Sequence, residues 1–129
     1  MNVLRNSMAL MAVVTALGVS VPAWAASDSA PPDEQLVHDL LDSLMEDDYD
    51  RFVTYVTPEF MTIAARDFAY ISTHLSPRLE KGYDVEYFGM LQQLGYDISV
   101  WKISFSDNYG DMLATMNLQG GKVAGFHLQ

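Results

Sequence analysis

The last third of the chain, residues 83–129, constrains the fold most, because its pattern predicts an antiparallel β meander. Apolar side chains alternate with polar ones through Trp101, Ile103 and Phe105. A repeat of two residues is typical of a strand with one face buried and the other in water. We therefore expect a strand from 96 to 105 whose apolar face is turned toward the core.

Two further strands are predicted around a tight turn. The runs 112–118 and 122–128 are rich in apolar residues and are joined by Gln119-Gly120-Gly121. A Gly-Gly step supplies the positive φ angles that a two-residue hairpin turn needs, so the two runs should pair directly. The register that follows sets Leu118 across from Val123, Met116 across from Gly125 and Ala114 across from His127. A first strand should run from Tyr83 to about Gln93 and turn at Leu94-Gly95.

In this register both faces of the terminal hairpin carry apolar side chains. Met112, Met116, Leu118 and Val123 fall on one face, and Leu113, Phe126 and Leu128 on the other. Helices can cover only one face, and leaving Phe126 and Leu128 in water would forgo roughly 1.5–3 kcal/mol each. We therefore expect a homodimer that forms through the sheet with two-fold symmetry. A bound ligand, a partner protein or curling of the last strand are the alternative ways to cover this face.

The segment before the sheet predicts helices. Asp33 suits the N-cap of a first helix. Its apolar residues recur at helical spacing, at Leu36, Val37, Leu40, Leu41, Leu44 and Met45. This helix should end in the acidic run 46–50, because carboxylates at a helix C-terminus oppose the helix dipole. Asp48 should begin a short second helix.

A third segment should begin at Thr57-Pro58, because threonine suits an N-cap and proline the first helical position. A separate helix is expected from about Asp67 to Leu79, and Pro77 should kink or divide it. Lys81-Gly82 is a C-terminal signal. The element order predicts an α+β domain, with N-terminal helices packed on one face of a curved three- to four-stranded antiparallel sheet.

The first 25 residues predict a signal peptide that is cleaved after Ala25. An apolar run from about Met8 to Val21 is followed by Ala23-Trp24-Ala25, whose small residues a signal peptidase reads. The run of about 14 residues is shorter than the ~20 that span a bilayer, so no stable membrane anchor is expected. Residues 26–32 predict a flexible leader and residues 33–129 the folded domain. We expect a periplasmic or secreted bacterial protein.

The chain is strongly acidic, with a formal net charge of −10, and it has no cysteine. Such a charge repels nucleic acid and anionic membranes, because both are bound by basic patches. It is compatible with a cationic ligand or partner, but the pattern favours an acidic surface that simply keeps the protein in solution. Without cysteine no disulfide can form, so the domain must be stabilised by its core alone.

Two stretches resemble the nuclear transport factor 2-like (cystatin-like α+β roll) superfamily. Residues 42–52 with Thr57-Pro58-Glu59-Phe60 resemble the helix, acidic turn and short helix that open many of its domains, and residues 118–126 resemble the final hairpin of its small exported members. The resemblance covers residues 33–129. It implies a cone-shaped roll, in which a curved sheet wraps a long helix around a pocket, often as a dimer. It implies no single activity, because the superfamily holds enzymes, binding modules and transport adaptors.

Four residues are candidates for lining a ligand pocket: His127, Met116, Trp101 and Tyr87. His127 is expected on the sheet face of Met116, inside the roll. The other histidines, His38 and His74, match no catalytic motif, so we assign no catalytic residue.

No metal site and no cofactor are predicted. The acidic run Asp47, Asp48 and Asp50 lacks the alternating oxygens, central glycine and distant glutamate of a calcium loop. The sequence also contains no glycine-rich phosphate loop and no Cys/His cluster with metal-ligand spacing.

These patterns favour an exported, non-catalytic binding module that holds a small apolar ligand or a protein partner. The alternative is a small enzyme, an isomerase or hydrolase, that uses a buried histidine or carboxylate. An enzyme needs at least two polar groups that face each other deep in an apolar cavity.

Overall fold

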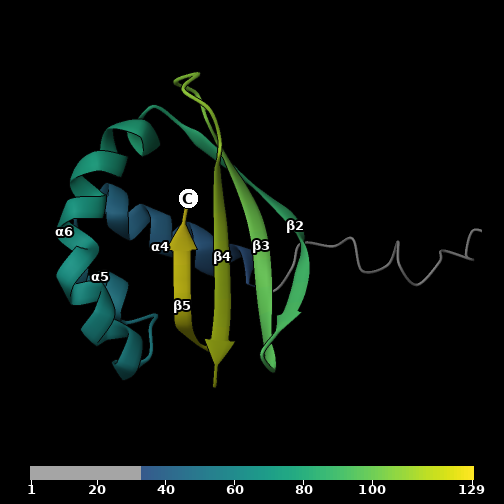
Figure 1. Ribbon diagram of the computed structural model, residues 1–129. Coiled ribbons are helices and arrows are strands. Elements are labelled where there is room, and N and C mark those ends of the chain that lie inside the picture. The colour runs from purple at the N-terminus through teal and green to yellow at the C-terminus, as the bar shows by residue number, and fades with distance from the viewer. Residues whose placement is uncertain (1–32) are drawn as a thin grey trace, which may run out of the picture. The chain divides into compact units, whose positions relative to one another are not determined.

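A computed structural model describes residues 33–129, and the predicted signal peptide and leader lie outside this range. The elements are α4 (Glu34–Met45), α5 (Tyr49–Val53), α6 (Pro58–Glu80), β2 (Tyr83–Gln93), β3 (Tyr96–Phe105), β4 (Met112–Gln119) and β5 (Lys122–Leu128). Three helices precede a curved, unclosed antiparallel sheet (Figure 1). The predicted α+β fold class is therefore confirmed. No helix in the described range is long and apolar enough to cross a bilayer.

The sheet is a meander in the order β2-β3-β4-β5, and local turn chemistry fixes its two outer hairpins. Leu94 and Gly95 have φ angles of 53° and 83°, and Gly120 and Gly121 have φ angles of 57° and 82°. Two successive positive φ angles define the turn that suits the twist of a two-residue hairpin. Both predicted turns and the predicted strand boundaries are confirmed.

The predicted register of the last hairpin is wrong beyond its first pairs. Leu118 lies across from Val123, as expected, but Met116 then pairs with Phe126, and Thr115 pairs with His127. The cause is a β-bulge at Ala124, which adds one residue to β5 and moves every later side chain to the opposite face. Phe126 is consequently buried on the helix-facing side.

The bulge removes part of the argument for a homodimer. Phe126 and Leu128 were expected on the outer face, but Phe126 belongs to the core and Leu128 packs partly against it. The outer face keeps partly exposed Ile98, Val100 and Leu113, together with Leu91, which pairs with Ile98 and is 52% exposed. Dimer formation through the sheet stays a prediction, supported by these side chains instead of Phe126 and Leu128.

Helix α6 is one helix of 23 residues, so the expected division near Asp67 and Pro77 is wrong. Its buried residues continue at helical spacing across both points: Phe60, Ala64, Phe68, Ser72, Leu75 and Leu79. A proline costs one intrahelical hydrogen bond, and Pro77 lies only three residues before the helix ends at Glu80. Burial of Leu79 beyond it outweighs that loss.

The predicted helix starts are largely confirmed. The side chain of Asp48 accepts a hydrogen bond from the Arg51 N–H at 3.0 Å, and that of Thr57 accepts one from the Phe60 N–H at 3.2 Å. Asp33 stands at the N-cap position of α4, but its side chain makes no capping bond. Two of the three caps therefore work as the sequence indicates.

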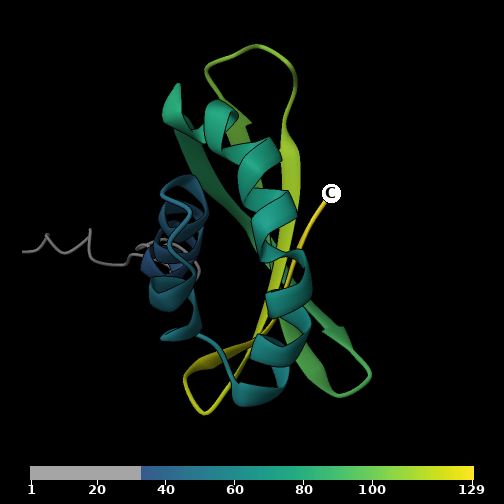
Figure 2. The same cartoon turned by 90° about the vertical axis from the view of Figure 1, so that its left-hand side faces the viewer.

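The core lies between the helices and the inner face of the sheet (Figure 2). Leu40 of α4 and Trp101 and Ile103 of β3 are fully buried in it. This confirms that the apolar stripe of the first helix and the alternating strand face each other in one core, although Leu36 is only partly buried.

Two serines join α6 to the end of α4. Ser72 Oγ donates to the Leu44 carbonyl at 2.6 Å, and Ser76 Oγ donates to the Met45 carbonyl at 2.7 Å. The last carbonyls of a helix have no intrahelical partner. These bonds satisfy two of them and fix the position of α6 relative to α4.

Candidate functional site

The position of α6 follows from a short contact at the edge of β5. The Thr57 N–H donates to the Val123 carbonyl at 2.9 Å, and the Val123 N–H donates to the Tyr55 carbonyl at 2.8 Å. The chain around Val56 thus pairs with β5 in parallel for one bridge and then coils into α6. Beyond Val123 the edge of β5 therefore faces a helix instead of another strand.

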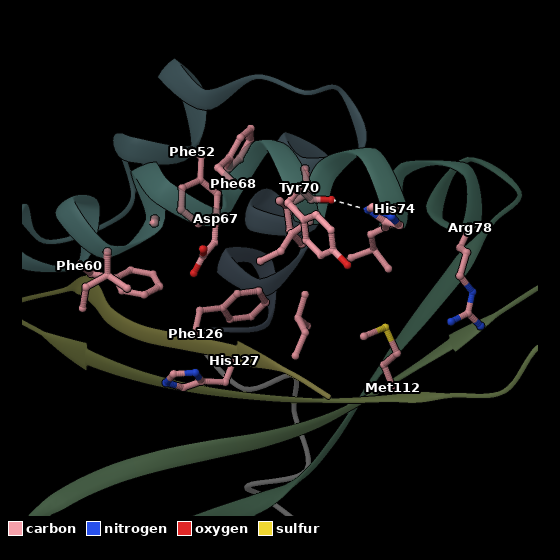
Figure 3. Close-up of a pocket in the computed structure, with 16 residues that line it drawn as sticks. Phe52, Phe60, Asp67, Phe68, Tyr70, His74, Arg78, Met112, Phe126 and His127 are labelled. Carbon is pink, nitrogen blue, oxygen red and sulfur yellow. Dashed lines mark hydrogen bonds between the residues drawn. The ribbon is translucent and has the colours of Figure 1, made fainter.

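A cleft of about 450 Å³ lies between α6 and β5. Its floor is made of buried apolar side chains, namely Phe60, Phe68, Leu75 and Phe126, and its walls include Ile63, Ile71, Met112 and Leu128. Figure 3 shows the ring of Phe126 between β5 and the helix above it. This volume is within the ~300–1,000 Å³ range of small-ligand sites. The cleft is the best-formed candidate site in the described residues.

The polar groups of the cleft lie at its rim. Asp67, Tyr70 and His74 come from the exposed face of α6, Arg78 from its last turn and His127 from β5 (Figure 3). Tyr70 is 68% exposed and packs against His74 with ring centroids 4.2 Å apart. The Nδ1 atom of His74 lies 2.9 Å from the Tyr70 carbonyl. Because a carbonyl only accepts, Nδ1 carries the proton and Nε2 is the open nitrogen.

The guanidinium of Arg78 is held by hydrogen bonds within the protein. Its Nε and Nη2 atoms donate to the two Asp107 carboxylate oxygens at 2.7 and 3.2 Å, and Nη2 also donates to the Gly110 carbonyl at 2.7 Å. The guanidinium lies 3.9 Å from the centroid of the Phe105 ring. The Arg78 hydrogen bonds hold the pKa of Asp107 below its usual value. The pair pins the β3–β4 loop to α6 and leaves little net charge at this end of the cleft.

The four predicted pocket residues do not form one site. Trp101 and Met116 are fully buried, and Tyr87 packs on Trp101 with ring centroids 5.0 Å apart. The Trp101 Nε1–H donates to Ser99 Oγ at 2.8 Å, and Ser99 Oγ donates to the Met116 carbonyl at 3.1 Å. These three residues belong to the inner face of the sheet, but Tyr87 is 38% exposed, and Met116 lines a second cleft of about 380 Å³ together with Ser99, Tyr96 and Leu118.

His127 lies apart from that group, and its predicted placement on the face of Met116 is wrong. It pairs with Thr115 on the opposite face because of the bulge at Ala124. It is exposed and lines the edge of the cleft instead. The residues of α6 at the rim were missed as a group. Their spacing, from Asp67 through Tyr70 and His74, was the available signal.

A second polar cluster joins α4 to β2. The Tyr83 hydroxyl donates to Asp42 Oδ1 at 2.7 Å, and His38 Nδ1 lies 3.2 Å from the same hydroxyl. Burial, followed by the bond to Asp42, raises the pKa of Tyr83 above its ordinary value. These groups satisfy one another and do not line the cleft, so we assign the cluster a structural role. No three His, Cys, Asp or Glu side chains between 33 and 129 are grouped to hold a metal.

None of the protein-family models, curated proteins and solved structures compared with this chain matches it. The resemblance to the nuclear transport factor 2-like superfamily therefore stays a prediction. The site has to be interpreted from its own geometry.

Proposed function

We propose that the protein is a non-catalytic binding module whose ligand lies in the cleft between α6 and β5. The observation that carries this proposal is the apolar lining, which stays partly open to solvent. Ile63 is 54% exposed at the mouth of the cleft, and Ile71, Met112 and Leu128 are only partly buried. An apolar ligand that covers such side chains gains roughly 25 cal/mol for each Å² removed from water.

The polar groups at the rim are better placed to orient a bound ligand than to catalyse a reaction on it. Asp67 lies 3.5 Å from Arg66, Arg78 is held by Asp107, and His74 is bonded through Nδ1 to its own helix. The enzyme alternative asks for two polar groups that converge inside an apolar cavity. The polar groups here surround the opening, so a binding role fits the geometry better.

Export is part of the same proposal and is supported by the pattern of residues 1–25. An apolar run followed by Ala23-Trp24-Ala25 is typical of a cleaved signal. N-terminal sequencing of protein from a periplasmic extract should give Ala26 as the first residue. Recovery of protein that begins at Met1, or only from the cytoplasm, would contradict export.

Titration with the neutral apolar dye N-phenyl-1-naphthylamine tests the site. We expect fluorescence to rise on saturable binding to the wild type, and Ile71→Glu to weaken binding at least about tenfold, because it places a charge in the apolar cleft. Leu94→Glu adds the same charge at a turn residue that is 92% exposed and should leave binding unchanged. Equal binding by all three proteins would remove the cleft as the site.

A further inference from the structure

The backbone groups of β5 alternate in direction along the cleft. Leu113 and Gln129 exchange both of their N–H···O bonds, at 2.7 and 2.9 Å. In an antiparallel pair, hydrogen-bonded positions alternate with positions whose N–H and C=O point away from the partner strand. The pairing is regular from Gly125 to Leu128. Phe126 and Leu128 therefore turn their backbone N–H and C=O groups away from β4, toward the side where α6 lies.

Within residues 33–129 no hydrogen-bond partner meets these backbone groups of Phe126 and Leu128. At Val123 the same edge is closed by Tyr55 and Thr57, but the chain then coils into α6, whose backbone bonds are internal. The side chains around the open edge are mainly apolar. Unpaired backbone groups next to apolar surface are unfavourable. A ligand that supplies both donors and acceptors therefore fits this cleft better than a purely apolar one.

We propose that the ligand is an extended peptide segment of a partner protein, which adds to the open edge of β5 as a further strand. This inference rests on the proposed binding function and names its ligand class. Main-chain hydrogen bonds to Phe126 and Leu128 supply the peptide's anchoring, and alternate side chains of the peptide enter the apolar cleft. At about 3.3 Å per residue, four or five peptide residues span this part of the edge.

Charge complementarity specifies the peptide further. The chain has a formal charge of −10, and five of its basic residues in the described range are already bonded to acidic side chains or carbonyls. These are Arg51, Arg66, Arg78, Lys102 and Lys122. The cleft itself is lined by one acidic residue, Asp67, so the attraction comes from the net charge of the whole chain, which speeds the association of cationic partners. The expected segment is apolar at alternate positions and carries lysine or arginine beside them.

Selection from a phage-displayed library of random seven-residue peptides on the purified protein tests this inference. We expect enrichment of extended, apolar sequences with basic residues. Calorimetry with a synthetic copy of the most enriched peptide should give an affinity that weakens in high salt. A library that yields no peptide above background would overturn the inference. Enrichment of acidic or helix-forming peptides would also overturn it.

Backbone pairing is tested by removing single N–H groups. Leu128→Pro deletes an N–H that faces away from β4, so the ladder to β4 stays intact, and peptide binding should weaken about tenfold. Leu128→Val keeps the N–H and an apolar side chain at this position, so it should bind the peptide more tightly than Leu128→Pro. A second test uses wild-type protein and is therefore independent of any effect on folding. Two peptides are compared, one N-methylated at the odd-numbered amides and one at the even-numbered amides, and only one of the two should bind more weakly. Equal binding by both peptides would refute strand addition.

The dye separates failure of this inference from failure of the binding function. Ile71→Glu should weaken the binding of both the dye and the peptide, because both ligands occupy the cleft that Ile71 lines. If Ile71→Glu leaves dye binding intact, the cleft is not a binding site. If the dye behaves as expected but no peptide is selected, the cleft binds a small apolar molecule and the peptide inference is wrong.

Discussion

The two edges of the sheet are built differently. β2 carries Asp84 and Glu86 at exposed positions and is interrupted by a bulge at Phe88, where the register to β3 shifts. Charges and bulges on an edge strand discourage other strands from pairing with it. From Val123 to its end at Leu128, β5 has no Asp, Glu, Lys or Arg, and α6 flanks it instead. The comparison indicates that the first half of β2 is protected by its own charges and by the bulge, whereas the uncharged edge of β5 is flanked by a helix that leaves a cleft.

The largest expected difference is in the free energy of unfolding, between a variant in the well-packed part of the core and a variant beside the cleft. Leu40 of α4 is fully buried, whereas Ile71 of α6 is partly exposed beside the cleft. In denaturant titrations we expect Leu40→Ala to lower the free energy of unfolding by about 2–5 kcal/mol. Ile71→Ala should cost less than about 1 kcal/mol, because the space beside it is already open. Similar costs for both variants would mean that the cleft is packed in solution.

The next largest effect concerns the register of β5. A Cβ atom on Gly125 would collide with the Asn117 side-chain oxygen, so Gly125→Ala should destabilise the protein by about 1–3 kcal/mol. Asn117→Ala should restore most of that loss in the double variant, as measured by thermal unfolding. Additive costs would show that Asn117 does not lie over Gly125 and would place the bulge elsewhere.

A smaller effect is expected where α4 meets β2. Tyr83→Phe removes the bond to Asp42 and should cost about 1 kcal/mol at neutral pH. The pKa of Tyr83 is raised in the folded state, so the folded protein holds this proton more tightly than the unfolded chain. The stability from this group is complete below pH ~10 and is lost as pH rises further. Melting curves between neutral and strongly alkaline pH should therefore fall more steeply for the wild type than for Tyr83→Phe.

The pair at the end of the cleft should give an effect that depends on pH in the acid range. Arg78→Gln removes the cation that lowers the pKa of Asp107, whose side chain is only 3% exposed, whereas that of Arg78 is 25% exposed. The stability from a lowered carboxyl pKa is complete above pH ~3.9 and is lost as pH falls through the folded-state pKa. The melting temperatures of wild type and variant should differ at neutral pH and converge in acid. A constant difference would assign the effect to packing on Phe105.

The strands were predictable because their signals are local. Two successive residues with positive φ at Leu94-Gly95 and Gly120-Gly121 fix the outer hairpins whatever the rest of the chain does. The bulge at Ala124 was not predictable from alternation, because a repeat of two residues carries no signal for one inserted residue. Because of this bulge, the sequence pattern assigns both His127 and Phe126 to the wrong face of the sheet.

The cleft was harder to predict than the strands because it depends on contacts between distant segments. Its position follows from the bonds of Tyr55 and Thr57 to Val123, together with the serine contacts that hold α6 against α4. The unbroken apolar stripe through Phe68 and Leu75 would have predicted a single α6. Pro77 does not divide the helix, because a proline in the last turn removes only one hydrogen bond.

Amide hydrogen exchange along β5, measured by NMR with and without the selected peptide, tests the open edge most directly. In the free protein we predict slow exchange at His127 and Gln129, whose N–H groups face β4, and fast exchange at Phe126 and Leu128. The peptide should slow exchange at Phe126 and Leu128 and leave His127 unchanged. Protection of Phe126 and Leu128 in the free protein, or fast exchange in the complex, would contradict strand addition at β5.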